Sequence, residues 1–246
     1  MTSTASVSSA ATARPQPTRR VTDAPTRMFH WLFALCFAGA YLTADGERLR
    51  LVHVVLGYSM AGLLGFRVLY GLFGPRQASL KALWAKASNA PLWLRSVWAG
   101  LTGGGTINWR QGQNIAMGAA IVALLLAVLP LTLSGYATYN EWGGEWLEDL
   151  HEVVGESMLW LVLAHLGLLL LISVLRRKNQ ALSMLTGRVD GAGPDLVKNN
   201  RSWLAALLLV AVLGYWGWEW QQAPQASSSS VTAPWADQRG HDGDDD

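Results

Sequence analysis

Charged residues are scarce in this chain. Asp, Glu, Lys and Arg make up 15% of its 246 residues, whereas soluble globular domains contain about a quarter. The chain has a single cysteine, which excludes a disulfide scaffold and a cysteine-rich zinc module. Its net charge of +2 is too small to indicate a nucleic-acid partner. These shortages argue against an ordinary soluble domain and leave the histidines as the candidates for binding a metal.

Long apolar stretches stand where the charges are missing. A membrane-spanning helix needs roughly 20 mostly apolar residues. Five stretches approach that length: residues 28–44, 49–73, 114–134, 151–174 and 203–218. We therefore predict an all-α membrane protein, with a four-helix transmembrane bundle and a fifth C-terminal transmembrane helix. The last stretch is short and ends in aromatic residues, so an interfacial anchor is the alternative for it.

The charges between these stretches assign an orientation. Four arginines and one acid precede the first stretch, and residues 74–113 carry five basic residues and no acid. Basic segments stay in the cytoplasm, so we expect a cytoplasmic N-terminus and a bacterial inner-membrane location. The segment between the third and fourth stretches has no base and should lie outside. Its acids are Glu141, Glu145, Glu148 and Asp149.

The chain divides into four expected regions. Residues 1–27 are rich in Ser, Thr, Ala and Pro and predict a disordered cytoplasmic tail, with an organelle transit peptide as the alternative. Residues 28–188 form the transmembrane domain, and residues 189–220 a loop and the fifth helix. Residues 221–246 form a disordered acidic tail that contains His241. Within the transmembrane domain, residues 79–101 alternate Trp with bases, which is typical of helices lying on the inner membrane surface.

Four of the five histidines lie in or at the ends of the apolar stretches: His30, His53, His151 and His165. Ionisable residues are rare there and usually carry function. His151 and His165 are 14 residues apart on one expected helix. That spacing separates them by about 21 Å along the helix axis but only about 40° in direction. One lies near each surface of the membrane, so a single metal ion cannot bind both.

The expected depth of each histidine in the membrane pairs each of these two with another histidine. His53 begins a helix that enters from outside, so it shares the outer level with His151. His30 lies at the cytoplasmic start of the first helix and shares the inner level with His165. A histidine pair without Cys, Asp or Glu fits axial ligation of haem iron better than a zinc or calcium site. The alternatives are interhelical hydrogen bonds in a scaffold without cofactor, and a histidine-based metal or ion transporter without haem.

Two glycines and two arginines accompany the histidines. Gly57 and Gly155 follow the outer histidines by one helical turn, where a flat porphyrin would reach the backbone; close helix packing explains them equally well. Arg67 lies at the inner histidine level by the same helical arithmetic. We expect a haem propionate as the counter-ion of Arg67, and also of Arg27, which lies near the first histidine. Snorkelling of Arg67 to the inner head groups is the alternative.

Three stretches of the chain resemble the bacterial cytochrome b561 family. They are TDAPTRMFHWLFALCFAGAYLT, HVVLGYSMAGLLGFRVLYGLFGPR and HEVVGESMLWLVLAHLGLLLLISVLRRKNQALSMLTGR. The resemblance covers approximately residues 21–188, and the family includes the b-type cytochrome subunits of nickel-iron hydrogenases. Its members are four-helix haem proteins that exchange electrons with the quinone pool. One departure is that Gly112-Gln113-Asn114-Ile115 stands where many members have Gly-His-Asn-Pro, so the role of that turn does not carry over.

The resemblance implies a function. It makes the four membrane histidines axial ligands of two b-type haems (iron protoporphyrin), through which single electrons would cross the membrane. The chain has no C-x-x-C-H site and no room for a soluble dehydrogenase domain. We therefore expect a link between the quinone pool and a protein redox partner, such as a periplasmic cytochrome c or a dehydrogenase subunit. The outer acids would steer a basic cytochrome. Whether the protein also acts as a quinone oxidoreductase stays open.

Overall fold

The computed structural model describes residues 17–103 and 106–222. Five long helices account for most of the fold: α1 (Ala24–Leu42), α2 (Arg50–Phe73), α5 (Trp109–Tyr139), α6 (Glu145–Arg176) and α8 (Ser202–Gln222). The shorter elements are β1 (Thr18–Arg20), η1 (Glu47–Leu49), η2 (Arg76–Ala78), α3 (Leu80–Ser88), α4 (Ala90–Leu101), α7 (Leu182–Thr186) and β2 (Arg188–Asp190). The predicted all-α membrane fold and the fifth C-terminal helix are confirmed.

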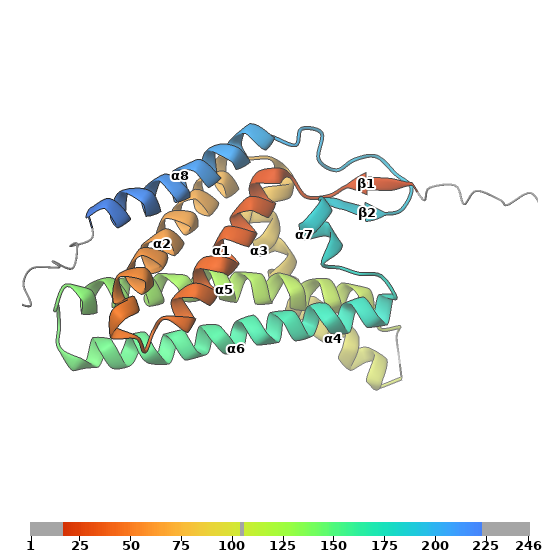
Figure 1. Ribbon diagram of the computed structural model, residues 1–246. Coiled ribbons are helices and arrows are strands. Elements are labelled where there is room, and N and C mark those ends of the chain that lie inside the picture. Colours follow the sequence, from red (N-terminus) through yellow and green to blue (C-terminus); the bar gives the residue numbers. More distant parts are fainter. Residues whose placement is uncertain (1–16, 104–105, 223–246) are drawn as a thin grey trace, which may run out of the picture.

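Within residues 17–103 and 106–222, four segments are long and apolar enough to cross a membrane: Glu47–Phe73, α5, α6 and α8. Helix α1 is not among them, because Arg27 and His30 lie within its 19 residues. It nevertheless runs beside α2 in the same bundle, as Figure 1 shows. The chain is therefore a multi-pass membrane protein. Many of its large apolar side chains are exposed, as on helices that face lipid.

The long helices form two antiparallel pairs with α8 added. Helix α1 packs on α2, and α5 packs on α6. Helix α8 covers α1 and α2, while α2 also packs on α5. In Figure 1, α5 and α6 run side by side, while α1, α2 and α8 run obliquely to them. Among the described residues, α6 makes extensive contacts with α5 alone. Where α6 faces α1 and α2, its backbone therefore stays apart from theirs.

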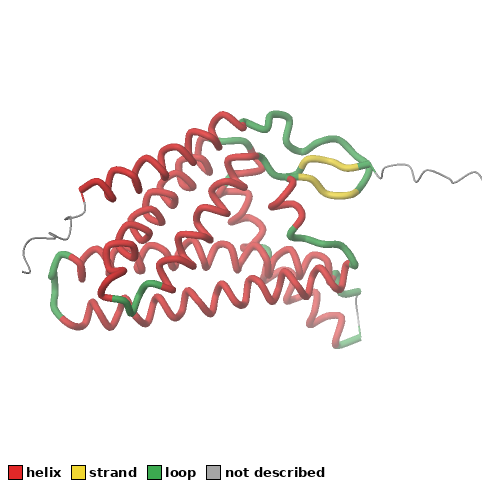
Figure 2. Tube along the Cα trace, in the orientation of Figure 1, coloured by secondary structure: helices red, strands yellow, loops and turns green. Residues whose placement is uncertain are grey.

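The two ends of the bundle differ in structure. Figure 2 shows short connections at the end where α1 meets α2 and where α5 meets α6. We call this the outer end, following the charge pattern. The opposite, inner end carries α7 and the antiparallel pair β1 and β2. Buried side chains between the helices, among them Met60, Val128 and Met158, hold the bundle together.

The N-terminal segment departs from the sequence prediction. Residues 1–27 were expected to be a disordered tail, but Thr18–Arg20 form β1 and α1 already begins at Ala24. The strand register joins Arg19 to Val189, a pairing 170 residues apart that local sequence does not signal. Residues 1–16 and 223–246 lie outside the described residues, and with them most of the two expected tails and His241.

The amphipathic segment of residues 79–101 contains the two expected helices, α3 and α4. Helix α3 packs along the inner part of α5. A Cβ atom on Gly118 of α5 would lie 3.3 Å from the Cβ atom of Lys86, so a glycine allows α3 to approach the spanning helix closely. Gly103, at the end of this segment, has a φ of +95° that favours glycine.

Candidate functional site

The outer histidines face each other between α2 and α6. The ring centres of His53 and His151 are 6.0 Å apart, and the ring planes are nearly perpendicular at 82°. Nδ1 of His53 lies 2.8 Å from the carbonyl oxygen of Ala40 on α1. Nδ1 of His151 lies 3.0 Å from the carbonyl oxygen of Leu131 on α5. A carbonyl only accepts hydrogen bonds, so each Nδ1 donates and each neutral ring keeps an unprotonated Nε2.

This arrangement fits two ligands of one metal ion. A bond between a metal and an imidazole nitrogen is about 2 Å long. If two imidazoles bound one metal ion from opposite sides, the two bonds and half of each ring would together separate the ring centres by roughly 6 Å. Metal-bound histidines usually donate their second ring nitrogen to a carbonyl or carboxylate, as both do here. Among the described residues, no three His, Cys, Asp or Glu side chains converge on a metal site. Paired ligation of haem iron therefore suits the site better than a zinc cage.

Small residues make room around the outer pair. A Cβ atom on Gly135 of α5 would lie 2.7 Å from Cε1 of His151, so only glycine lets this ring occupy its place. A Cβ atom on Gly57 would meet nothing within 4 Å, which leaves open space one turn beyond His53. Gly155 instead faces Leu131, at an ordinary contact distance of 3.8 Å. Sequence reasoning missed Gly135, because it lies on a helix without a ligand.

The inner histidines lie in the same region of the bundle, near enough for their charges to interact. His165 of α6 lies within electrostatic range of His30 of α1. Nδ1 of each ring is buried and has no hydrogen-bond partner among the described residues. A buried polar atom without a partner is costly, so the described protein groups alone do not complete this site. The inner and outer rings on α6 are 14 residues apart, which keeps the two sites about 21 Å apart along the helix.

Both expected arginines lie at the inner end. Arg67 is only 8% exposed, and its Nη1 donates to the carbonyl oxygen of Ala78 over 2.7 Å. Its burial within protein argues against snorkelling to lipid head groups. Nη1 of Arg27 donates to the carbonyl oxygen of Leu185 over 2.8 Å, while its Nε is buried without a partner. Each guanidinium thus has one nitrogen held by the backbone and others left for an anion such as a carboxylate.

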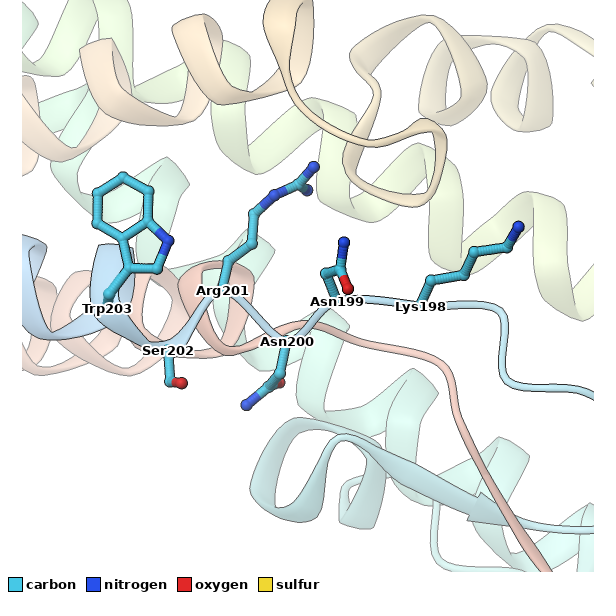
Figure 3. Close-up of a pocket in the computed structure, with 6 residues that line it drawn as sticks. All are labelled: Lys198, Asn199, Asn200, Arg201, Ser202 and Trp203. Atoms are coloured by element: carbon cyan, nitrogen blue, oxygen red, sulfur yellow. The ribbon is translucent and has the colours of Figure 1, made fainter.

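A pocket at the start of α8 lies apart from the histidines. Figure 3 shows its lining residues, Lys198, Asn199, Asn200, Arg201, Ser202 and Trp203. No histidine lines it. It is a feature of the inner surface and not part of either histidine pair.

The family model for prokaryotic cytochrome b561 matches residues 21–187 of the chain. The match covers α1 to α7 and all four membrane histidines. This chain belongs to the prokaryotic cytochrome b561 family. Members bind b-type haem and transfer electrons within the membrane, so the prediction of a haem-bearing membrane cytochrome is confirmed at that level, and the transporter without haem is not supported. Helix α8 lies outside the matched range. No curated protein and no solved structure matches this cytochrome b561.

Proposed function

We propose that this cytochrome b561 carries electrons across the membrane through two b-type haems. His53 and His151 hold one near the outer surface, and His30 and His165 hold the other near the inner surface. The outer pair carries the proposal: its ring centres lie 6.0 Å apart and both Nδ1 atoms lie within hydrogen-bond distance of backbone carbonyls. The inner pair adds two buried ring nitrogens that lack a partner.

Each group of residues has a defined task. When bound, haem supplies reversible one-electron chemistry. The carbonyls of Ala40 and Leu131 orient the outer imidazoles and increase their basicity. Gly57 and Gly155 keep the helix surfaces beside the outer ligands free of large side chains. Arg67 and Arg27 offer guanidinium groups to the propionates at the inner end.

We further propose that the protein links the quinone pool to a redox protein outside the membrane, such as a periplasmic cytochrome c or a dehydrogenase subunit. Exposed acids surround the start of α6: Glu141, Glu145, Glu148, Asp149 and Glu152. They adjoin His151 in the sequence, where they would attract a basic partner to the outer haem. The basic segments at the opposite end support a cytoplasmic N-terminus and an inner-membrane location.

The test is the haem content of purified protein, measured with its reduced-minus-oxidised absorption spectrum. The parent protein should contain two haems per chain. His53→Ala and His165→Ala should each remove one haem and leave the other reducible. His241→Ala, in the C-terminal tail, serves as the control and should retain both. A folded parent protein without iron porphyrin would contradict the proposal.

A further inference from the structure

Hydrogen bonds join Asp23, Tyr70 and Arg201 at the inner end of the bundle, and Arg67 lies one helical turn before Tyr70 on α2. Asp23 is 2% exposed, and Tyr70 and Arg67 are each 8% exposed. The Asp23 carboxylate accepts hydrogen bonds from the backbone nitrogen of Thr26, over 3.2 Å, and from the Tyr70 hydroxyl. Nη1 of Arg201 donates to the Tyr70 hydroxyl oxygen over 3.4 Å. We call Asp23, Arg67, Tyr70 and Arg201 the inner charge cluster.

The cluster joins three parts of the chain. Asp23 caps the start of α1, Arg67 and Tyr70 lie near the end of α2, and Arg201 precedes α8. Figure 3 shows the Arg201 side chain extending away from the start of α8. The backbone nitrogen of Ala24 also donates to the carbonyl oxygen of Asn200 over 3.1 Å. A helix outside the family match is thus tied directly to the haem-bearing bundle.

The negative charge of Asp23 is not needed for helix capping. Asparagine caps a helix start as well as aspartate does, and its amide nitrogen, in the place of the Oδ2 atom that now accepts from Tyr70, would donate a hydrogen bond to the Tyr70 hydroxyl oxygen. A buried charge is retained when it has a partner of opposite sign. Asp23 lies within electrostatic range of Arg67, and the cluster contains two guanidinium groups and one carboxylate. The carboxylate therefore partly offsets a concentrated positive charge.

That charge balance acts at the inner histidine level. Asp23 is seven residues from His30, which corresponds to about 10 Å along α1. Arg67 lies 14 residues from His53, and so about 21 Å from the outer level. Charges in a low-dielectric interior act strongly at short range and are poorly screened. The cluster therefore acts on the inner site far more than on the outer one.

We propose that Asp23 is a positioning residue for electron transfer, whose carboxylate offsets the positive charge of Arg67 and Arg201 and so keeps the reduction potential of the inner haem low. The inference rests on the proposed function, because it assumes a haem held by His30 and His165. A nearby positive charge favours the reduced, less positive haem, and a nearby negative charge favours the oxidised haem. Removing the carboxylate alone therefore raises the inner potential.

The test is a redox titration of both haems in the full-length protein. Asp23→Asn should raise the inner-haem potential and leave the outer-haem potential unchanged, whereas Asp23→Glu should restore the parent value. Arg67→Gln should shift the inner potential in the opposite direction. The matched control is Asp190→Asn, which removes an exposed acid at the same end and should change neither potential.

The double variant Asp23→Asn with Arg67→Gln keeps the inference testable if either single variant folds poorly, because it loses one charge of each sign. Its inner potential should lie closer to the parent value than that of Arg67→Gln does. Identical potentials in the double variant and in Arg67→Gln would overturn the inference, as would an Asp23→Asn protein with two haems and parent potentials. A parent protein without an inner haem would overturn the proposed function as well.

Discussion

The outer and inner histidine pairs offer the same ligands but hold them differently. Nδ1 of His53 and Nδ1 of His151 lie against backbone carbonyls of α1 and α5. Nδ1 of His30 and Nδ1 of His165 are buried without partners. A hydrogen bond at the second ring nitrogen fixes the ring and makes it a more basic ligand. The outer site is therefore organised by the protein, whereas the inner site depends on the group it binds and on the charges near it.

This difference has a consequence for the redox potentials. More basic axial ligands favour oxidised iron, whereas a buried positive charge nearby, such as that of Arg67, favours reduced iron. The outer pair has carbonyl partners, while the inner pair has Arg67 and Arg27 at its level. We expect the outer haem to have the lower potential of the two.

The largest effect is expected from filling the space beside His151. Gly135→Val would place a side chain where even a Cβ atom lies 2.7 Å from the ring, so the ring must move. The outer haem should be largely lost and the inner haem retained, which haem quantification and the reduced spectrum will show. Gly62→Val on α2 is the control, because a Cβ atom there would meet nothing within 4 Å. Equal loss of both haems in Gly135→Val would contradict the prediction that Gly135 borders the outer site alone.

Haem removal provides the next test. Because carbonyl partners are found, in the described part of the chain, only for the outer rings, mild denaturant should release the inner haem first, and haem added back to stripped protein should fill the outer site first. Loss of the hydrogen-bond partner of a metal-binding histidine typically lowers metal affinity about 10 to 100-fold, and a difference of about that size is expected between the sites. Haem absorbance recorded at increasing denaturant concentration measures this difference. Spectra of the His53→Ala and His165→Ala proteins identify which haem is lost at each step. Release in the reverse order would contradict this interpretation of the two sites.

A smaller effect is expected from Ser134→Ala. The Ser134 hydroxyl lies 3.3 Å from Nδ1 of His151, which already has the closer Leu131 carbonyl at 3.0 Å. Losing this secondary partner should change the free energy of reduction of the outer haem by about 1 kcal/mol or less. A redox titration should show a small shift in the reduction potential of the outer haem alone. Ser157→Ala on the exposed side of α6 is the control and should change the reduction potential of neither haem.

The smallest effect is expected from a single outer acid. Glu148→Gln removes one of several exposed carboxylates beside the outer site, so it should slow electron exchange with a basic cytochrome c by about twofold at low salt. The difference should disappear at high ionic strength, where surface charges are screened. Stopped-flow mixing measures the rate. A rate that is independent of ionic strength in both proteins would exclude electrostatic steering at this end.

Helix positions and the levels of the histidines were predictable from sequence because both follow from local spacing. The spacing of 14 residues between His151 and His165 fixes two levels on one helix, whatever the remaining structure. The apolar stretches likewise predicted α2, α5, α6 and α8, although α5, α6 and α8 extend beyond them. Their charged and aromatic ends, such as Trp109 and Glu145, do not count as apolar.

The partners of the histidines were not predictable in the same way. The carbonyls of Ala40 and Leu131 belong to helices that approach the rings only in the folded bundle, and every residue has a carbonyl. Gly135 is 16 residues from His151 in sequence, and nothing in its surroundings marks it as a neighbour of that ring. The hydrogen bond between Asp23 and Tyr70 spans 47 residues. Such contacts depend on tertiary packing, which single-residue patterns do not encode.

The most direct measurement is a redox titration of the purified protein followed by visible absorbance, with iron porphyrin counted per chain. We expect two one-electron steps from two haems, of which the step at lower potential disappears in His151→Ala and the step at higher potential disappears in His30→Ala. A protein with one step, or one that loses both steps together in either variant, would contradict the assignment of two separate histidine-bound haems.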